Sequence, residues 1–138
     1  MKRVGIVCDR RVLDDMAVHQ VHDEYIAAVR DGVGALPLLV PSTDTPLNSA
    51  DLLAAVDGLL FTGAVSNVAP SHYGGDLRPG TELDEIRDAT TLPLESATVR
   101  SRKFRRPLKP CRILAGSGLV VVEPSGRWMT CVIVIGLA

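Results

Sequence analysis

Three short apolar runs are the clearest feature of the hydrophobic pattern along the chain. They cover Val4–Cys8, Ala35–Pro41 and Gly58–Thr62, and each lies between charged residues, glycines or prolines. Short, nearly continuous apolar runs are typical of strands buried on both faces, as in a parallel sheet. The pattern therefore predicts three buried strands.

The segment between the first two runs has the period of an amphipathic helix. Apolar residues recur at i, i+4, i+7 and i+8 from Val21 to Val29, with charged residues between them. Gly32 and Gly34 then indicate the end of this helix.

Two more helices follow from capping signals. Ser49 is the expected N-cap of a helix that buries Leu52, Leu53 and Val56. Further on, Thr81–Asp84 has the form of a capping box and predicts a helix that runs towards Leu92, where Pro93 argues against its continuation.

Strands and helices alternate in the order β-α-β-α-β, which favours right-handed crossovers and an α/β, flavodoxin-like parallel sheet with flanking helices. Ligand sites in such sheets lie beyond the carboxyl ends of the strands. The loop that follows Thr62 is therefore the expected place for function.

Charge divides the chain into two parts. Residues 1–99 hold 7 Lys and Arg against 15 Asp and Glu, whereas residues 100–138 hold 8 against 1. We expect an N-terminal α/β part, residues 1–94, and a divergent basic and apolar tail, residues 95–138. In the tail, Leu119–Val122 and Cys131–Ile135 suit a β-hairpin that turns at Pro124–Gly126.

Composition excludes several other kinds of site. The N-terminal apolar run is too short for a signal peptide, and no stretch is long enough to cross a bilayer, so we expect a cytoplasmic protein. Cys8, Cys111 and Cys131 fit no disulfide framework, and Cys8 and Cys131 suit core packing. His19 and His22 could share a helix face but have no third ligand, so we expect no metal.

Three stretches resemble the γ-glutamyl-γ-aminobutyrate hydrolase family of the class I glutamine amidotransferase-like group. They are Tyr25–Val29 running into Gly34–Pro41, then Asp57–Pro70 continuing to His72-Tyr73-Gly74, and finally Asp84–Asp88 with its Arg-Asp pair. The resemblance implies hydrolysis of γ-glutamyl amides by a cysteine nucleophile, without a cofactor, on a small substrate such as one formed in polyamine or putrescine catabolism.

The resemblance also implies where the site residues lie. Gly63 and Ala64 correspond to the turn whose backbone N–H groups hold the oxyanion. Ser66, Asn67, His72 and Tyr73 follow on the same loop as substrate-binding candidates, and Cys111 in the pair Cys111-Arg112 corresponds to the nucleophile.

The plainer interpretation of each of these loop residues stays open. Ser66 and Asn67 suit side-chain hydrogen bonds that fix the loop, and Tyr73 suits a packing anchor. Arg87 and Asp88 suit either an exposed surface pair or a structural role on their helix.

The chain departs from the family after Leu94. The segment before Cys111 is basic and broken by prolines, Ile113 stands where the family has glycine, and no histidine follows His72. We expect little or no hydrolysis by this chain. One hypothesis is that the reading frame was disrupted after Leu94, which the genomic sequence downstream of that codon would test.

The competing class is a non-catalytic module that binds a small ligand or an anionic partner. Arg100–Arg106 with Phe104 has charges that could neutralise phosphates, but no recognition motif accompanies it, so we expect no nucleic-acid partner. An uncovered sheet edge would favour a homo-oligomer.

Overall fold

A sheet with β1 at its centre organises the computed structural model of the chain, in which residues 1–101 and 134–135 are described. The elements, in chain order, are β1 (Arg3–Val7), β2 (Asp9–Leu13), β3 (Met16–Gln20), α1 (Asp23–Ala27), the π-helical η1 (Ala28–Val33), β4 (Leu36–Val40), α2 (Ser49–Ala55), β5 (Gly58–Phe61), the 3₁₀ turn η2 (Pro70–His72), α3 (Glu85–Arg100) and β6 (Val134–Ile135).

The sheet has the strand order β4-β1-β5-β6. β1 pairs in parallel with both β4 and β5, and β6 is antiparallel to β5. The three parallel strands thus lie in the spatial order 2-1-3, as in flavodoxin-like folds. The three predicted strands and the α/β class are confirmed, with strand ends shifted by a residue or two.

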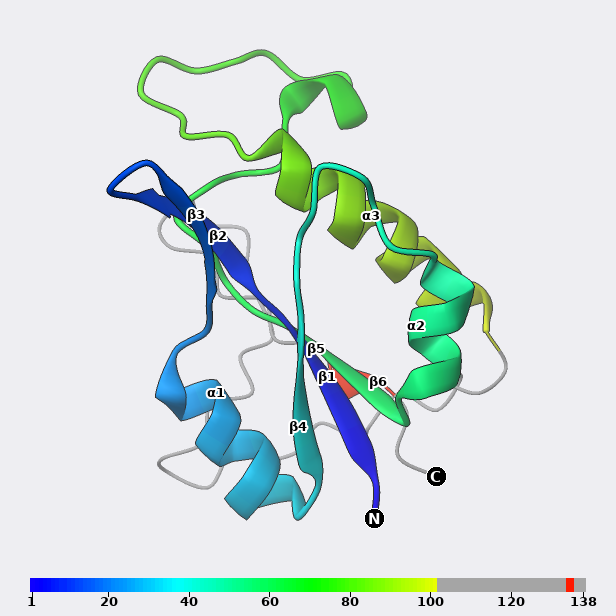
Figure 1. Cartoon of the computed structure of the whole chain (residues 1–138). Helices are drawn as coiled ribbons and strands as arrows, with labels where there is room; N and C mark the ends of the chain where they lie inside the picture. The colour runs from blue at the N-terminus through cyan, green and yellow to red at the C-terminus, as the bar shows by residue number, and fades with distance from the viewer. Residues whose placement is uncertain (102–133, 136–138) are drawn as a thin grey trace.

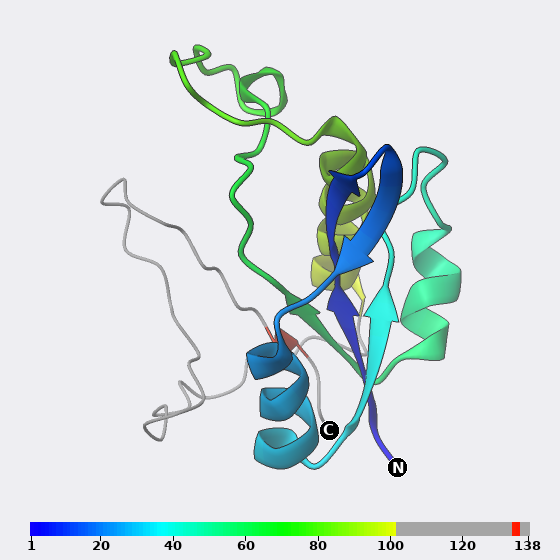
Figure 2. The ribbon, with the colours of Figure 1, turned by 60° about the vertical axis from the view of Figure 1, so that its left-hand side comes forward.

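Helices cover both faces of this sheet (Figures 1 and 2). One face carries α1 and η1, and its core contains Val4, Ile6, Val29, Ala35 and Leu60. The other face carries α2 and α3, and its core contains Val7, Val40, Val56, Leu59, Phe61 and Leu94. Because β1 contributes to both clusters, its apolar run has no polar alternation.

The N-caps of two helices differ from the predictions. Asn48, not Ser49, caps α2, because its Oδ1 accepts the N–H groups of Ala50 at 2.8 Å and Asp51 at 3.4 Å. Asp84, not Thr81, caps α3 by accepting the N–H of Arg87. The glycine stop is confirmed, since Gly34 ends η1 with φ 69°.

Pro93 does not end α3, contrary to the prediction, and the helix continues to Arg100. Residues that follow the proline are anchored in the core, since Leu94 and Thr98 are both fully buried. Packing of this face on the sheet outweighs the hydrogen bond that the proline cannot donate.

A hairpin of β2 and β3 was not predicted. Leu13 pairs with Met16, so Asp14 and Asp15 form a two-residue turn, and both have positive φ. Aspartate tolerates this backbone region and suits such turns. The hairpin extends from the carboxyl end of β1 beyond the sheet (Figure 1).

Several predictions concern residues outside the described ranges. The strand at Leu119–Val122, the turn at Pro124–Gly126 and the cysteines Cys111 and Cys131 all lie there. Within the predicted strand Cys131–Ile135, the two residues of β6 do form a strand. No helix among the described residues has the length and apolar character that crossing a bilayer requires.

Gly5 offers a direct test of the packing around β1. A Cβ at this position would lie 2.9 Å from Leu59 Cδ2 and 3.0 Å from Val40 Cγ2. We expect Gly5→Ala to reduce the free energy of unfolding by about 1–3 kcal/mol through overpacking. Gly32→Ala is the matched control, since its Cβ would meet nothing within 4 Å. Urea unfolding of both variants measures the difference, and equal stabilities would contradict the described packing.

Candidate active site

The long loop after β5 extends beyond the carboxyl ends of the parallel strands, at the same end of the molecule as the β2–β3 hairpin (Figure 2). Gly63 and Ala64 open this loop and are partly buried. Within the described ranges, neither of their backbone N–H groups donates a hydrogen bond. At the end of β5, these two donors therefore have no acceptor among the described residues.

Arg87 of α3 fixes the peptide group from which this turn starts. Its Nη2 donates to the carbonyl oxygen of Thr62 at 2.5 Å. Because a trans peptide is planar, with C=O and N–H on opposite sides, holding the Thr62 oxygen towards α3 directs the N–H of Gly63 away from α3. The Thr62 hydroxyl donates to the Val7 carbonyl at 2.8 Å, which ties the turn to β1.

Arg87 is itself held in place by the first residue of β2, Asp9, and by the cap of its own helix. Its Nε lies 3.9 Å from Asp9 Oδ1 and is buried without a hydrogen-bond partner in the described part of the chain. Asp9 also accepts a hydrogen bond from Arg11 Nε at 3.3 Å. One carboxylate therefore lies between two guanidinium groups.

Asp88, the next residue of α3, holds the middle of the loop. Its Oδ2 accepts the backbone N–H of Ala69 at 2.8 Å and lies 4.0 Å from His72 Nε2. Asp88 is 3% exposed, so its carboxylate is removed from water and depends on these partners. The interpretation of Arg87 and Asp88 as an exposed surface pair is wrong, and the structural role is confirmed.

The side chains predicted on the loop do not converge on one point. Ser66 is partly buried, whereas Asn67, His72 and Tyr73 are exposed. Tyr73 is 66% exposed and is therefore no packing anchor. The backbone of Asn67 helps to fix the loop, since its N–H donates to the Glu82 carbonyl. The side chains of Ser66 and Asn67 make no hydrogen bond to the part of the chain that the structure describes.

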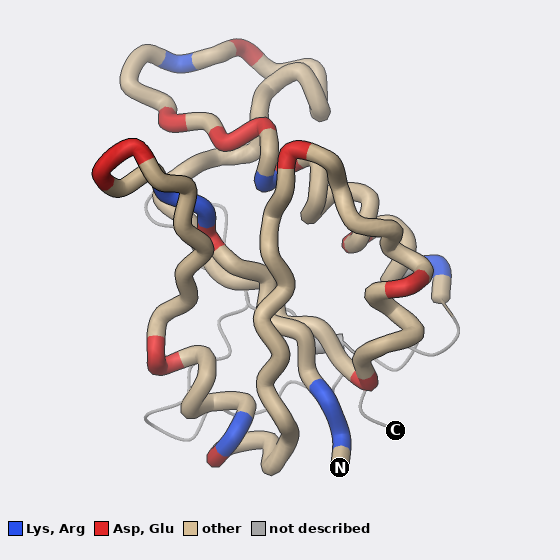
Figure 3. The backbone as a smooth tube through the Cα atoms, viewed as in Figure 1, with Lys and Arg blue, Asp and Glu red and all other residues tan. Residues whose placement is uncertain are grey.

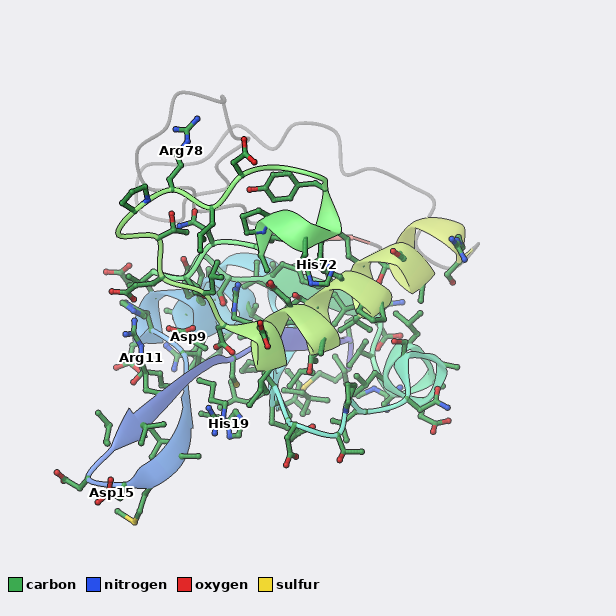
Figure 4. The ribbon with its side chains drawn as sticks, turned by 90° about the horizontal axis from the view of Figure 1, so that it is seen from above. Asp9, Arg11, Asp15, His19, His72 and Arg78 are labelled. Carbon is green, nitrogen blue, oxygen red and sulfur yellow. The ribbon has the colours of Figure 1, made fainter. Side chains whose placement is uncertain are left out.

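A polar pocket of about 200 Å³ lies between this loop and the hairpin. Its lining residues are Asp9, Arg10, Arg11, Val12, Ser66, Glu82, Leu83 and Asp84. Acidic residues follow the loop and the hairpin turn, and the arginines of β2 and α3 lie between them (Figure 3). Seen from above, Asp9 and Arg11 are side by side, and His72 lies apart from them over α3 (Figure 4).

Sequence reasoning missed the contribution of β2 to this pocket. Asp9, Arg10 and Arg11 looked like the charged boundary of the first strand. The signal that could have revealed them is the Asp14-Asp15 turn between short apolar pairs, which indicates a hairpin.

The two early histidines lie in different elements. His19 lies in β3, with its Nε2 2.6 Å from the Ser42 carbonyl oxygen, and His22 caps α1 with its ring against Tyr25. The sequence suggested that His19 and His22 could share a helix face, and this prediction is wrong. No cluster of three or more His, Cys, Asp or Glu suited to a metal ion occurs among the described residues.

Cys8 is confirmed as a core residue, 1% exposed. Burial raises the pKa of its thiol above the ordinary value of 9.0, and the charge of Asp9 raises it further, against a lowering effect of a backbone hydrogen bond with Val40. The thiol is therefore protonated at neutral pH and unsuited to nucleophilic attack.

Comparison with known protein families identifies the family to which this chain belongs. The family model of peptidase C26 matches residues 3–107, which include the three parallel strands of the sheet, the Gly63–Ala64 turn and α3. The chain belongs to the peptidase C26 family. The family resemblance expected from the sequence is confirmed.

The chain is similar to the gamma-glutamyl-gamma-aminobutyrate hydrolase of Escherichia coli O157:H7. It is 30% identical over 102 residues, which cover 72% of this chain and 39% of that protein. The peptidase C26 chain described here thus spans less than half the length of this relative.

Asp88 should be important for the stability of the loop in this peptidase C26 chain. We expect Asp88→Ala to cost about 1.5–3 kcal/mol, because the N–H of Ala69 loses a charged acceptor. Asp88→Asn should cost less, since its amide oxygen can still accept. Urea unfolding and faster hydrogen exchange at the Ala69 amide are the measurements. Glu85→Ala, in the same helix turn, is the exposed control, and an equal loss there would refute the role of Asp88.

The raised pKa of Cys8 predicts a dependence of stability on pH. Since the folded state disfavours the thiolate, the stabilisation is fully present below the unfolded pKa of 9.0 and is lost as pH rises through the higher folded pKa. We expect the stability difference between the wild type and Cys8→Ala to shift against the wild type between about pH 7.5 and about pH 10. Urea unfolding of both proteins at each pH measures it, and a constant difference would contradict the prediction.

Proposed function

We propose that this chain carries the oxyanion-binding half of a γ-glutamyl amide hydrolase site in the cytoplasm. The backbone N–H groups of Gly63 and Ala64 are the proposed donors. The observation that supports this most directly is that both groups are partly buried and unpaired within the described ranges, while Arg87 holds the peptide from which they start. Donors oriented before the reaction need no reorganisation when negative charge develops.

The proposed reaction is acyl transfer without a cofactor. A cysteine thiolate attacks the γ-carbonyl carbon, a C–S bond forms, and the oxyanion that develops is bound at the turn. The C–N bond then breaks, and the amine leaves with a proton. Water hydrolyses the thioester and releases glutamate. By family resemblance Cys111 is the nucleophile, and it lies outside the described residues.

We further propose that the 138-residue polypeptide catalyses this reaction little or not at all. The family takes its base from a histidine that follows the nucleophile, and no histidine follows His72 in this sequence. His72 itself precedes the nucleophile in the sequence, and its Nε2 lies 4.0 Å from Asp88 Oδ2. A thiol without a neighbouring base is a weak nucleophile at neutral pH.

Release of glutamate from γ-glutamyl-γ-aminobutyrate tests this proposal, with the Escherichia coli relative as positive control. We expect no release above background by the purified chain and no change in Cys111→Ala. Release that Cys111→Ala abolishes would show that the chain is a complete enzyme and would overturn the proposed inactivity.

The oxyanion turn is tested in a chimera in which residues 1–94 precede the part of the relative that follows the matched region. Ala64→Pro removes the backbone donor and should lower kcat by about 10²–10³-fold. Ala64→Gly retains the N–H and serves as the matched control, and circular dichroism verifies folding of both. Equal activity of the two variants would contradict the assignment of the Ala64 N–H as an oxyanion donor.

A further inference from the structure

The hairpin of β2 and β3 is a sheet of only two strands that projects from the rest of the molecule, with Asp15 at its tip (Figures 1 and 4). β3 pairs with β2 along one of its edges, over the whole of Met16–Gln20. No backbone hydrogen bond joins β3 to a described residue outside the hairpin. Within the described ranges, the outer edge of β3 is therefore open.

The turn decides which backbone groups of β3 lie on this outer edge. Asp14 and Asp15 both have positive φ, as in a type I′ turn, which closes with a hydrogen bond between the two residues that flank it. Bonded and non-bonded pairs alternate along an antiparallel ladder, so the backbone groups of Ala17 and His19 are directed away from β2. Both residues are exposed. The edge thus presents N–H and C=O groups at the spacing that a further strand requires.

β3 lacks the features that usually keep an open edge from pairing. Met16–Gln20 contains no Lys, Arg, Asp or Glu, no proline and no glycine, and its register with β2 continues without a bulge. β2 is different, because three of its five residues are charged, namely Asp9, Arg10 and Arg11. Of the two strands, only β3 is suited to edge pairing.

Apolar side chains gather on the same segment. Met16 is 64% exposed, and its cross-strand neighbour Leu13 is 54% exposed. Because side chains alternate along a strand, Val18 lies on the same face as Met16. One face of the hairpin therefore presents an apolar row that reaches the open edge, and covering such a row is favourable.

We propose that the outer edge of β3 pairs with the same edge of a second copy of this chain, antiparallel about a two-fold axis at Val18. In this register, Ala17 of each copy lies opposite His19 of the other, so that their outward backbone groups exchange both hydrogen bonds. Val18 then lies opposite Val18 of the second copy in a non-hydrogen-bonded pair, where side chains are closest. Met16 lies opposite Gln20. The edge is self-complementary, as a two-fold interface requires.

Charge favours this arrangement over two alternatives. In the antiparallel pair, the tip carboxylates of Asp14 and Asp15 lie at opposite ends of the joined edge, whereas a parallel pair would bring those of both copies together. The same antiparallel geometry applied to β2 would place Arg11 opposite Arg11 of the second copy. Pairing through β3 avoids both repulsions.

The joined edge is short, since β3 has five residues. Such an interface falls below the range of about 1,200–2,000 Å² that is usual for stable complexes, so the dimer should be weak and reversible. The pairing uses none of the groups in the proposed oxyanion turn. Its failure would therefore leave the proposed function untouched, and the converse also holds.

Sedimentation equilibrium of the full 138-residue chain, with a thiol reductant to exclude disulfide-linked dimers, measures the association. We expect a reversible monomer–dimer equilibrium between about 1 and about 500 μM, the range of weak complexes. A monomer at all of these concentrations, or assembly that continues beyond a dimer, would overturn the proposal.

Substitutions in the two strands then locate the joined edge. Ala17→Pro removes an outward N–H of β3 and should raise the dissociation constant of the dimer by at least about tenfold. Val12→Pro is the matched control, because Val12 is the cross-strand partner of Ala17 and its N–H is directed to the opposite edge. Circular dichroism and thermal unfolding verify that both variants are folded. Equal effects of the two substitutions would contradict pairing through β3.

An exchange of charge tests the register. Val18→Lys and Val18→Glu each place two like charges opposite each other at the two-fold axis, so each variant alone should be monomeric. An equimolar mixture should dimerise again, because the charges are then opposite in sign. Recovery in the mixture cannot result from a loss of folding. A mixture that associates no more than its separate components would overturn the two-fold pairing at Val18.

Discussion

Burial of β1 on both faces is the constraint on which the other described elements depend. A strand in this position must be apolar along its length, must pair on both edges and must be covered by helices on both sides. β4 and β5 pair with its two edges. Its side chains are covered by α1 on one face and by α2 and α3 on the other. Gly5 shows how closely the neighbours approach, since even one methyl group would contact Leu59 too tightly.

Contacts at and just after the end of β1 fix the start of the loop that follows β5. Val7 accepts the hydroxyl of Thr62, and Asp9 lies beside Arg87, which in turn holds the Thr62 carbonyl. The adjacent residues Arg87 and Asp88 of α3 thus link the start of β2, the peptide that follows β5 and the middle of the loop. The contacts of Thr62 and Arg87 orient the backbone of the Gly63–Ala64 turn, and the side chain of Ala64 is not needed for this.

Periodicity and capping chemistry predicted the parallel sheet and its helices, because buried strands and amphipathic helices leave direct marks on the sequence. The exact caps were harder, since Asn48 and Ser49 are adjacent candidates of similar propensity, and Thr81 and Asp84 are two such candidates three residues apart. The continuation of α3 past Pro93 is decided by tertiary packing of Leu94, which no local pattern contains. For the site, the family pattern indicated the loop, whereas the pocket combines residues from β2 and the loop that only the fold brings together.

Pro93 divides α3 into two parts with different mechanical roles. The missing N–H leaves the carbonyl of Ala89 without its usual partner, so the hydrogen-bond ladder is interrupted between the two halves. The residues that hold the loop, Arg87 and Asp88, both precede this interruption, whereas Leu94 and Thr98 follow it. Fraying of α3 from its carboxyl end would therefore reach the interruption at Pro93 before it reached Arg87 and Asp88.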